Sequence, residues 1–204
     1  EVLGRKSPLY GRRTGQWKLD VLGFKDVTAL FPNASLEKSI EFYSIVGGVP
    51  LYVLELSSKK TVFENARDAI ASRGALLYQE TDFVLKEELR EPKTYFSILK
   101  EIAGSKTSLS ELANALGLER TTLGRYLSTL MELDLIQVLK PVTGKEKTKN
   151  TVYSLKDNYF KFWFKFIYPF KAELDSFDYS SFEKNFKQNF NTFLGRQFEQ
   201  VCVQ

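Results

Sequence analysis

The chain has 204 residues, of which 43% are hydrophobic and 26% charged, with a net charge of +4; this composition is typical of globular domains with one or two cores. It contains no histidine and a single cysteine, which excludes an internal disulfide and any acid–base or metal chemistry that relies on histidine. We find no signal peptide and no apolar run long enough to cross a bilayer, so we expect a cytoplasmic protein that does not associate with membranes.

The first third of the chain is predicted to change from loop to helix at Ser35. Residues 1–34 are interrupted by four glycines and predict a loop-like segment. Ser35 is expected to cap a helix that stops at Gly47-Gly48, and Pro50 suits the first turn of the next helix. Apolar residues at helical spacing predict two further helices, over about 60–73 and about 78–89.

A pair of short helices followed by a hairpin is predicted after Pro92, which marks the start of another helix. Ser108 and Glu111 form a capping box, and Gly117 ends the short helix that follows. A second helix begins near Glu119 and carries leucines on one side. The remaining predicted segments are a strand over 135–139, a polar turn over 143–150 and a returning strand over 151–155. This pattern is typical of a winged helix-turn-helix, so we expect a mainly α fold with a small β-wing.

The C-terminal part of the chain is rich in aromatic residues. Residues 157–170 predict a helix that is apolar on nearly every side and is therefore buried between domains. The alternative is a helix that lies on a membrane surface or docks a partner. Residues 180–204 predict a final amphipathic helix, in which we expect Cys202 to be a buried apolar residue.

Four segments of the chain resemble one protein family. They are residues 7–15 (SPLYGRRTG), 47–52 (GGVPLY), 85–99 (LKEELREPKTYFSIL) and 193–199 (FLGRQFE). In this order they are similar to segments of archaeal P-loop ATPases of the AAA+/STAND type. The resemblance implies the end of an ATPase core over 1–34, a helical lid over 35–84, a winged helix-turn-helix over 85–170 and the start of a nuclease-like C-terminal domain over 171–204.

The phosphate-binding loop of such ATPases, Gly-x-x-x-x-Gly-Lys-Ser/Thr, does not occur in the 204 residues. The resemblance therefore places ATP and Mg²⁺ in a longer parent protein, whose missing N-terminal ATPase core is a partner of this chain. We do not expect the chain alone to hydrolyse ATP. The resemblance also implies that Gly48 and Pro50 lie near the adenine and that Arg12 and Arg13 contact phosphate. The alternatives are a plain junction between two helices and solvated surface arginines.

Polar residues off the leucine face of the second predicted helix are candidates for contact with double-stranded DNA. They are Arg120, Thr121, Thr122, Arg125 and Thr129, joined by Lys145, Lys147 and Lys149 in the hairpin turn. The alternative is a winged helix that contacts a protein or holds a lid against an ATPase core. The predicted function is an ATP-binding switch whose winged helix contacts DNA or a protein partner; the alternative is a DNA-binding regulator that needs no nucleotide.

Overall fold

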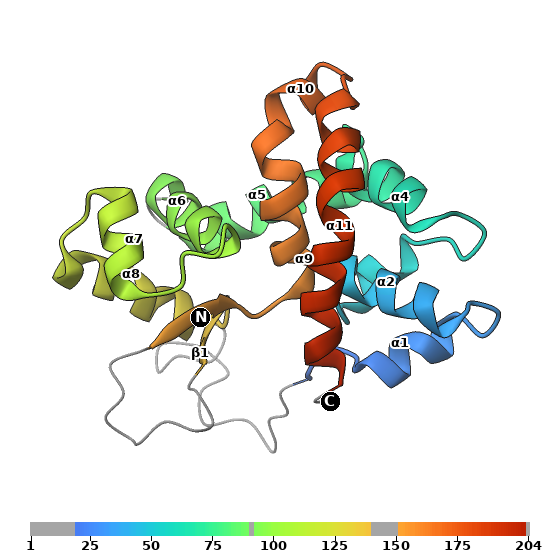
Figure 1. Ribbon diagram of the computed structural model, residues 1–204, viewed down its shortest axis with the longest axis horizontal. Coiled ribbons are helices and arrows are strands. Elements are labelled where there is room, and N and C mark those ends of the chain that lie inside the picture. Colours follow the sequence, from blue (N-terminus) through green and yellow to red (C-terminus); the bar gives the residue numbers. More distant parts are fainter. Residues whose placement is uncertain (1–18, 90–91, 140–150, 203–204) are drawn as a thin grey trace, which may run out of the picture.

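The structure, a computed structural model, describes residues 19–89, 92–139 and 151–202. These residues form a mainly helical fold with one antiparallel sheet of two strands, which confirms the predicted fold class at that level (Figure 1). The bounds, in chain order, are α1 (Phe24–Leu30), α2 (Leu36–Val46), α3 (Pro50–Leu54), α4 (Val62–Asn65), the π-helical η1 (Ala66–Ala71), α5 (Leu76–Glu88), α6 (Pro92–Ala103), α7 (Leu109–Leu116), α8 (Arg120–Glu132), β1 (Ile136–Leu139), β2 (Val152–Leu155), α9 (Asn158–Phe162), the π-helical η2 (Trp163–Ile167), the 3₁₀-helical η3 (Tyr168–Phe170), α10 (Lys171–Asp175) and α11 (Ser180–Val201).

The start of the helical region agrees with the sequence. The Ser35 hydroxyl accepts a hydrogen bond from the Lys38 amide at 3.2 Å, which satisfies one of the free amides of α2. Gly47 ends this helix with a φ of 66°, a conformation that L side chains rarely adopt, and Pro50 is the first residue of α3. The capping signals are confirmed.

The prediction of a loop up to residue 34 is wrong for α1. The Asp26 carboxylate accepts a hydrogen bond from the Gly23 amide at 3.1 Å and thereby caps this helix. Val27 is fully buried, and the ring of Phe24 packs edge-on against that of Tyr43. A glycine just before a short apolar segment begins this helix, although it reads as a loop signal in the sequence. Residues 1–18 of the predicted loop lie outside the described residues.

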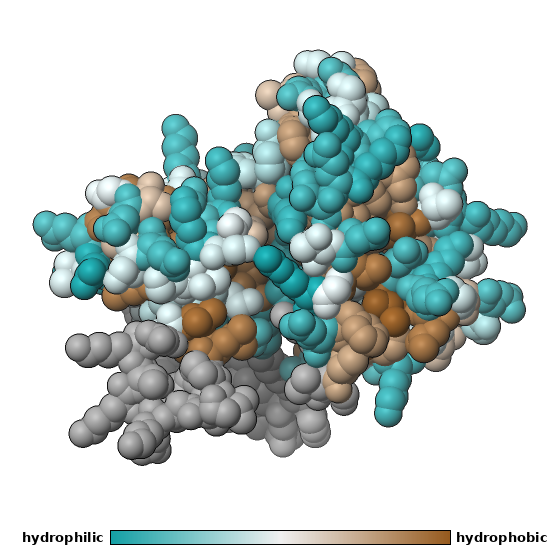
Figure 2. Space-filling view, viewed as in Figure 1, coloured by the Kyte–Doolittle hydropathy of each residue, from teal (hydrophilic) through white to brown (hydrophobic). Residues whose placement is uncertain are grey.

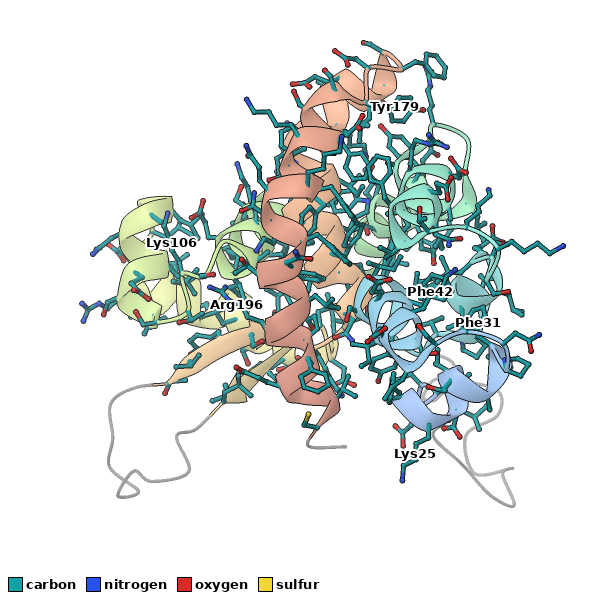
Figure 3. All side chains as sticks on the ribbon, turned by 45° about the vertical axis from the view of Figure 1, so that its right-hand side comes forward. Lys25, Phe31, Phe42, Lys106, Tyr179 and Arg196 are labelled. Atoms are coloured by element: carbon teal, nitrogen blue, oxygen red, sulfur yellow. The ribbon has the colours of Figure 1, made fainter. Side chains whose placement is uncertain are left out.

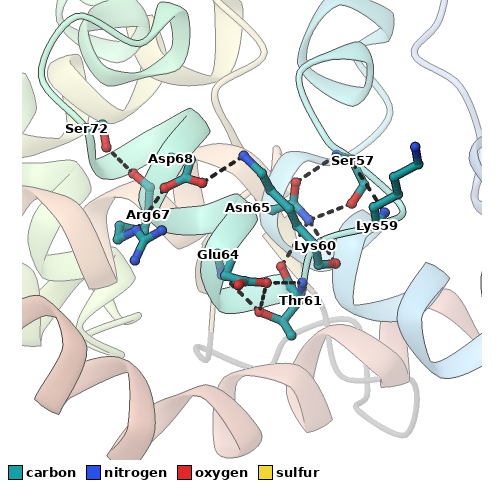
Figure 4. Close-up of polar contacts among 9 residues, drawn as sticks. All are labelled: Ser57, Lys59, Lys60, Thr61, Glu64, Asn65, Arg67, Asp68 and Ser72. Carbon is teal, nitrogen blue, oxygen red and sulfur yellow. Dashed lines mark hydrogen bonds and ion pairs between the residues drawn. The ribbon is translucent and has the colours of Figure 1, made fainter.

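The loop between α3 and α4 is held by one buried side chain, Asn65 (Figure 4). Its amide oxygen accepts a hydrogen bond from the Ser57 amide at 2.8 Å, and its amide nitrogen donates to the carbonyls of Ser57 and Thr61, both at 3.0 Å. The Thr61 side chain and the Glu64 carboxylate form a capping box at the start of α4. Both polar atoms of the Asn65 side chain are therefore hydrogen-bonded to the backbone of the loop, which holds the loop in place.

Helices α6, α7 and α8 and the hairpin form one packed unit. Ser108 and Glu111 form the predicted capping box of α7, and Gly117 ends α7 in the left-handed conformation with a φ of 63°. The buried leucines Leu112, Leu123, Leu127 and Leu130 join the two helices. Strands β1 and β2 pair with Ile136 opposite Leu155 and Leu139 opposite Val152.

Most of the aromatic segment is buried, as predicted, and it lies between the α6–α8 unit and the N-terminal helices (Figure 1). Its rings pack against those of α11: the Phe166 ring lies 5.7 Å from that of Phe186 and packs edge-on against Phe193 at 5.4 Å. Helix α2 packs against both α9 and α11. The aromatic side chains therefore join the N-terminal and C-terminal helices in one core.

The far end of α11 differs from the prediction in one respect. Cys202 follows the last helical residue and is exposed, so the expectation of a buried apolar cysteine is wrong. The apolar face of α11 is last continued by half-buried Val201, and the cysteine lies beyond it. None of the described helices is both long enough and apolar enough to span a bilayer.

Candidate nucleic-acid interface and basic cavity

The predicted DNA-binding residues of helix α8 lie away from the side of the helix that packs in the core. Its leucines, Leu123 and Leu127 among them, are buried against α7, whereas Arg120, Thr121 and Arg125 are exposed. Residues three and four apart share a helical face, so these three side chains lie together on the outer face of α8. We call the exposed positions 120, 121, 124, 125 and 128 the outer face of α8.

The two other predicted threonines on this helix are less available. Thr122 and Thr129 are half-buried at the sides of the helix, and the Thr129 hydroxyl donates to the carbonyl of Arg125 at 3.2 Å. The structure thus brings three of the five predicted residues fully to the surface and leaves two at its margin.

Gly124 lies in the middle of the outer face and was not among the predicted residues. A Cβ added there has no heavy atom within 4 Å, so space does not require glycine at this position. Glycine in an exposed helix interior destabilises a protein by roughly 1 kcal/mol relative to alanine. Gly124 comes three residues after Thr121 and four residues after Arg120. This spacing, visible in the sequence, places the three residues on one helical face. The outer face therefore carries no side chain at position 124, between Arg120 and Arg125.

Acidic groups border the outer face at both ends. Glu119 precedes the first residue of α8, and the Glu132 carboxylate in the last turn accepts a hydrogen bond from Ser128 at 3.4 Å. The positive charge is therefore confined to the first half of the helix. This is the half that a recognition helix inserts into a major groove.

The hairpin extends beside α8, but its turn lies outside the described residues. The predicted lysines Lys145, Lys147 and Lys149 fall in the range 140–150 and carry no structural description. At the other end of the hairpin, the Lys156 ammonium pairs with the Asp134 carboxylate at 2.6 Å.

Gly48 has a structural role that the sequence did not reveal. The Leu22 amide donates to the Gly48 carbonyl at 2.8 Å, and a Cβ on Gly48 would lie 1.8 Å from the Leu22 carbonyl oxygen. The close approach of two backbone segments therefore requires glycine at this position. Pro50 is exposed nearby at the start of α3, and Arg12 and Arg13 lie outside the described residues. The proposed contacts of these four residues with nucleotide stay predictions.

A cavity of about 380 Å³ lies where the α6–β2 unit meets α9, η2 and α11. Three cationic side chains line it: Lys161 from α9, Lys165 from η2 and Arg196 from α11. Sequence reasoning missed this cavity. Lys161 and Lys165 stand one helical turn apart in an apolar segment, which was a usable signal. Arg196 and its hydrogen-bond partner Ser105 are 91 residues apart, so no local pattern predicts their contact.

Among the described residues, no three carboxylate, cysteine or histidine side chains gather where they would hold a metal ion.

Two family models match the chain. Residues 37–160 match the model described as "Domain of unknown function (DUF8612)", and residues 163–204 match the one described as "Archaea bacterial proteins of unknown function" (DUF234). The first match covers more than half of the chain, so the chain belongs to the DUF8612 family. The two matches meet within the buried aromatic segment formed by α9 and η2.

The chain also resembles an archaeal protein, "Uncharacterized protein MJECL04" of Methanocaldococcus jannaschii. The two are 37% identical over 204 residues, which is 99% of this chain and 45% of that protein. The chain therefore spans a little under half the length of this curated relative. No solved structure matches the chain.

Proposed function

We propose that residues 92–155 form a winged helix-turn-helix module that binds double-stranded DNA through the outer face of α8. The observation that carries this proposal is the distribution of side chains on α8. Its leucines are buried against α7, while Arg120, Thr121 and Arg125 surround the exposed Gly124.

The chemistry of this face suits a major groove. Arginine donates paired hydrogen bonds to the O6 and N7 of guanine, and threonine contacts phosphate or the methyl group of thymine. Because Gly124 has no side chain, the helix backbone can approach the DNA closely between the arginines. Gly117 ends α7, and the buried leucines of α7 and α8 pack the two helices against each other, so the face is preorganised.

Charge reversal on α8 tests this proposal. We expect Arg125→Glu to weaken binding of a fluorescent duplex by roughly 5- to 150-fold, the equivalent of about 1–3 kcal/mol. Lys184→Glu is the matched control, because Lys184 is exposed on α11 and its reversal changes the net charge equally. Equal effects of the two variants, or no salt-dependent binding by the wild type, would favour a module that contacts a protein instead.

We further propose that the module belongs to a nucleotide-driven switch, with ATP and Mg²⁺ bound by a part of the protein outside this chain. The resemblance of the motif order to AAA+/STAND ATPases supports this proposal. The apolar surface beside Gly48 supports it also, because Leu51 and Leu54 on α3 are 49% and 73% exposed and offer a contact to another domain. The test is the duplex affinity of the full-length protein with and without ATP and Mg²⁺. A difference between the two is expected, and identical affinities would favour the nucleotide-independent regulator.

A further inference from the structure

The walls of the basic cavity come from separate parts of the fold. One wall is formed by the end of α6, the turn that follows it and strand β2; the other is formed by α9, η2 and α11. Figure 3 shows Arg196 on α11, on the side that faces the α6–α7 region. Side chains distant in sequence are thus brought to one cavity, which is open to solvent on the side of the exposed Arg196.

Lys161 is the most buried cation of the cavity, with 8% of its surface exposed. Its ammonium donates to the side-chain oxygens of Asn158 at 3.1 Å and Gln197 at 3.5 Å, both neutral amide groups. The carboxylate that acts on it most, Asp157, accepts a hydrogen bond from the Phe160 amide and caps α9. A lysine is rarely buried to this extent. Here its position is fixed by partners from two helices.

The two other cations are also held in place. The Arg196 guanidinium donates to the Ser105 hydroxyl at 2.9 Å, which ties α11 to the turn after α6. The Lys165 ammonium lies 5.8 Å from the centre of the Phe166 ring and 5.7 Å from that of Phe193. The charge of Arg196 contributes to lowering the pKa of Lys165, after burial. The two positive charges thus repel one another, and an anion between them would offset this repulsion.

The rest of the lining suits a phosphate ester. The hydroxyl-bearing residues Ser105, Thr107 and Ser154 add neutral polar groups beside the cations, although the Ser154 hydroxyl itself donates to the Leu155 carbonyl at 3.1 Å. No carboxylate occurs among the described residues that line the cavity. Apolar surface comes from Ile102 and Phe193. The volume of about 380 Å³ falls within the range of small-molecule sites and exceeds the size of a bare phosphate ion.

We propose that this cavity binds a small organic phosphate, whose phosphoryl group lies among Lys161, Lys165 and Arg196. The organic part of the ligand then contacts Ile102 on one wall and Phe193 on the other. Because both walls contribute contacts, the bound ligand joins the α6–β2 unit to α11. The cavity is lined by none of the residues of the α8 outer face, so this proposal does not depend on DNA binding.

The test uses the intact chain and calorimetric titration with inorganic pyrophosphate and with adenosine monophosphate, with adenosine as the uncharged control. We expect both phosphates to bind and adenosine not to bind. Arg196→Gln and Lys165→Gln should each weaken binding by about tenfold or more, because each removes a charge-assisted hydrogen bond. Lys184→Gln on the same helix should leave binding unchanged. Absence of heat with both phosphates, or an equal loss in Lys184→Gln, would overturn the proposal.

Two further measurements distinguish ligand binding in this cavity from DNA binding and from an effect of misfolding. Arg125→Glu should retain phosphate binding, and Arg196→Gln should retain duplex affinity. A loss of duplex affinity in Arg196→Gln as large as that in Arg125→Glu would show that the cavity belongs to the DNA-binding surface, and the small-ligand proposal would then be wrong. A phosphate-dependent rise in the unfolding midpoint, at matched ionic strength in chloride, is expected for the wild type. It should be lost in Lys161→Met, which keeps the shape of the buried chain.

Discussion

Lys161 is a lysine buried beside a largely aromatic core, where its charge is accommodated by hydrogen bonds. The residue is 8% exposed, and its ammonium donates to side-chain oxygens of Asn158 and Gln197. Burial lowers the pKa of Lys161 to about 8, and the charge of Asp157 partly opposes this shift. At neutral pH the ammonium is therefore still mostly protonated, and the cavity keeps its positive charge.

The lowered pKa of Lys161 predicts a specific dependence of stability on pH. The pKa of Lys161 is about 8 in the folded chain and has its ordinary value of 10.5 in the unfolded chain. Between about pH 8 and pH 10.5 the unfolded chain therefore binds more protons than the folded chain. The free energy of unfolding must therefore gain a contribution that rises with pH across this window. Denaturant titrations from pH 7 to 10 should show a less positive slope for Lys161→Met than for the wild type. Parallel curves for the two proteins would contradict this account. The other titratable groups that face the cavity, Lys165, Arg196 and Tyr153, are unchanged in this comparison.

Gly48 permits a second test at the residue scale. Gly48→Ala would place a methyl group 1.8 Å from the Leu22 carbonyl oxygen, a backbone atom that cannot move aside alone. We expect a loss of about 1–3 kcal/mol in the free energy of unfolding. Gly195→Ala is the matched control, because a Cβ on this helical glycine meets no atom within 4 Å. The control should be neutral or slightly stabilising. A harmless Gly48→Ala would refute the backbone contact.

A glycine-to-alanine substitution on helix α8 gives a test at the scale of an element. Gly124→Ala adds a methyl group in open space and should stabilise the chain by about 0.4–1 kcal/mol. If the helix backbone approaches DNA closely at this point, the same variant should bind a duplex less tightly. Thermal unfolding and duplex titration of one variant therefore separate stability from function. Equal or tighter binding would count against close approach at Gly124.

The aromatic contact between η2 and α11 joins the central aromatic segment to the last helix of the described residues. Phe186 is 5% exposed and meets the rings of Phe63, Phe166 and Phe190. Truncation of a buried phenylalanine costs about 3–5 kcal/mol, so Phe186→Ala should destabilise the protein by that amount. Phe198→Ala, on the same helix but 47% exposed, should change stability by less than about 0.5 kcal/mol. Similar unfolding midpoints for the two variants would contradict the assigned packing.

Most elements were predictable because their signals are local. Capping residues such as Ser35, Ser108 and Glu111 act within one helical turn, and leucines at helical spacing define the buried side of α8. Helix α1 was missed because its cap comes from Asp26, inside the helix, after a glycine that looks like a loop.

At the scale of the whole molecule, contacts between distant residues limited the prediction. The candidate DNA-binding face follows from one helix, so its residues were accessible to sequence reasoning. The basic cavity depends on the meeting of Ser105 with Arg196 and of Lys161 with Gln197, which the packing of α11 produces. The role of Gly48 likewise depends on the path of residues 19–23 past α2. These contacts between distant residues are visible only in the folded structure.

Hydrophilic residues cover much of the visible face of α7 and upper α11, whereas apolar atoms gather at the lower right beside α1 and α2 (Figure 2). A second group of apolar atoms lies at the lower centre, near the hairpin, where Leu139 on β1 is 43% exposed. The apolar surface is therefore not confined to one end of the molecule.

The salt dependence of duplex binding is the most direct test of the central claim, that the outer face of α8 contacts DNA. The logarithm of the association constant should fall linearly with the logarithm of the salt concentration, because each neutralised phosphate releases a counterion. The double variant Arg120→Ala/Arg125→Ala is predicted to bind a duplex less tightly than the wild type at every salt concentration, and to reduce this slope by about 1 for each arginine that contacts a phosphate. An unchanged slope, with affinity equal to that of the wild type, would show that α8 does not touch the DNA backbone.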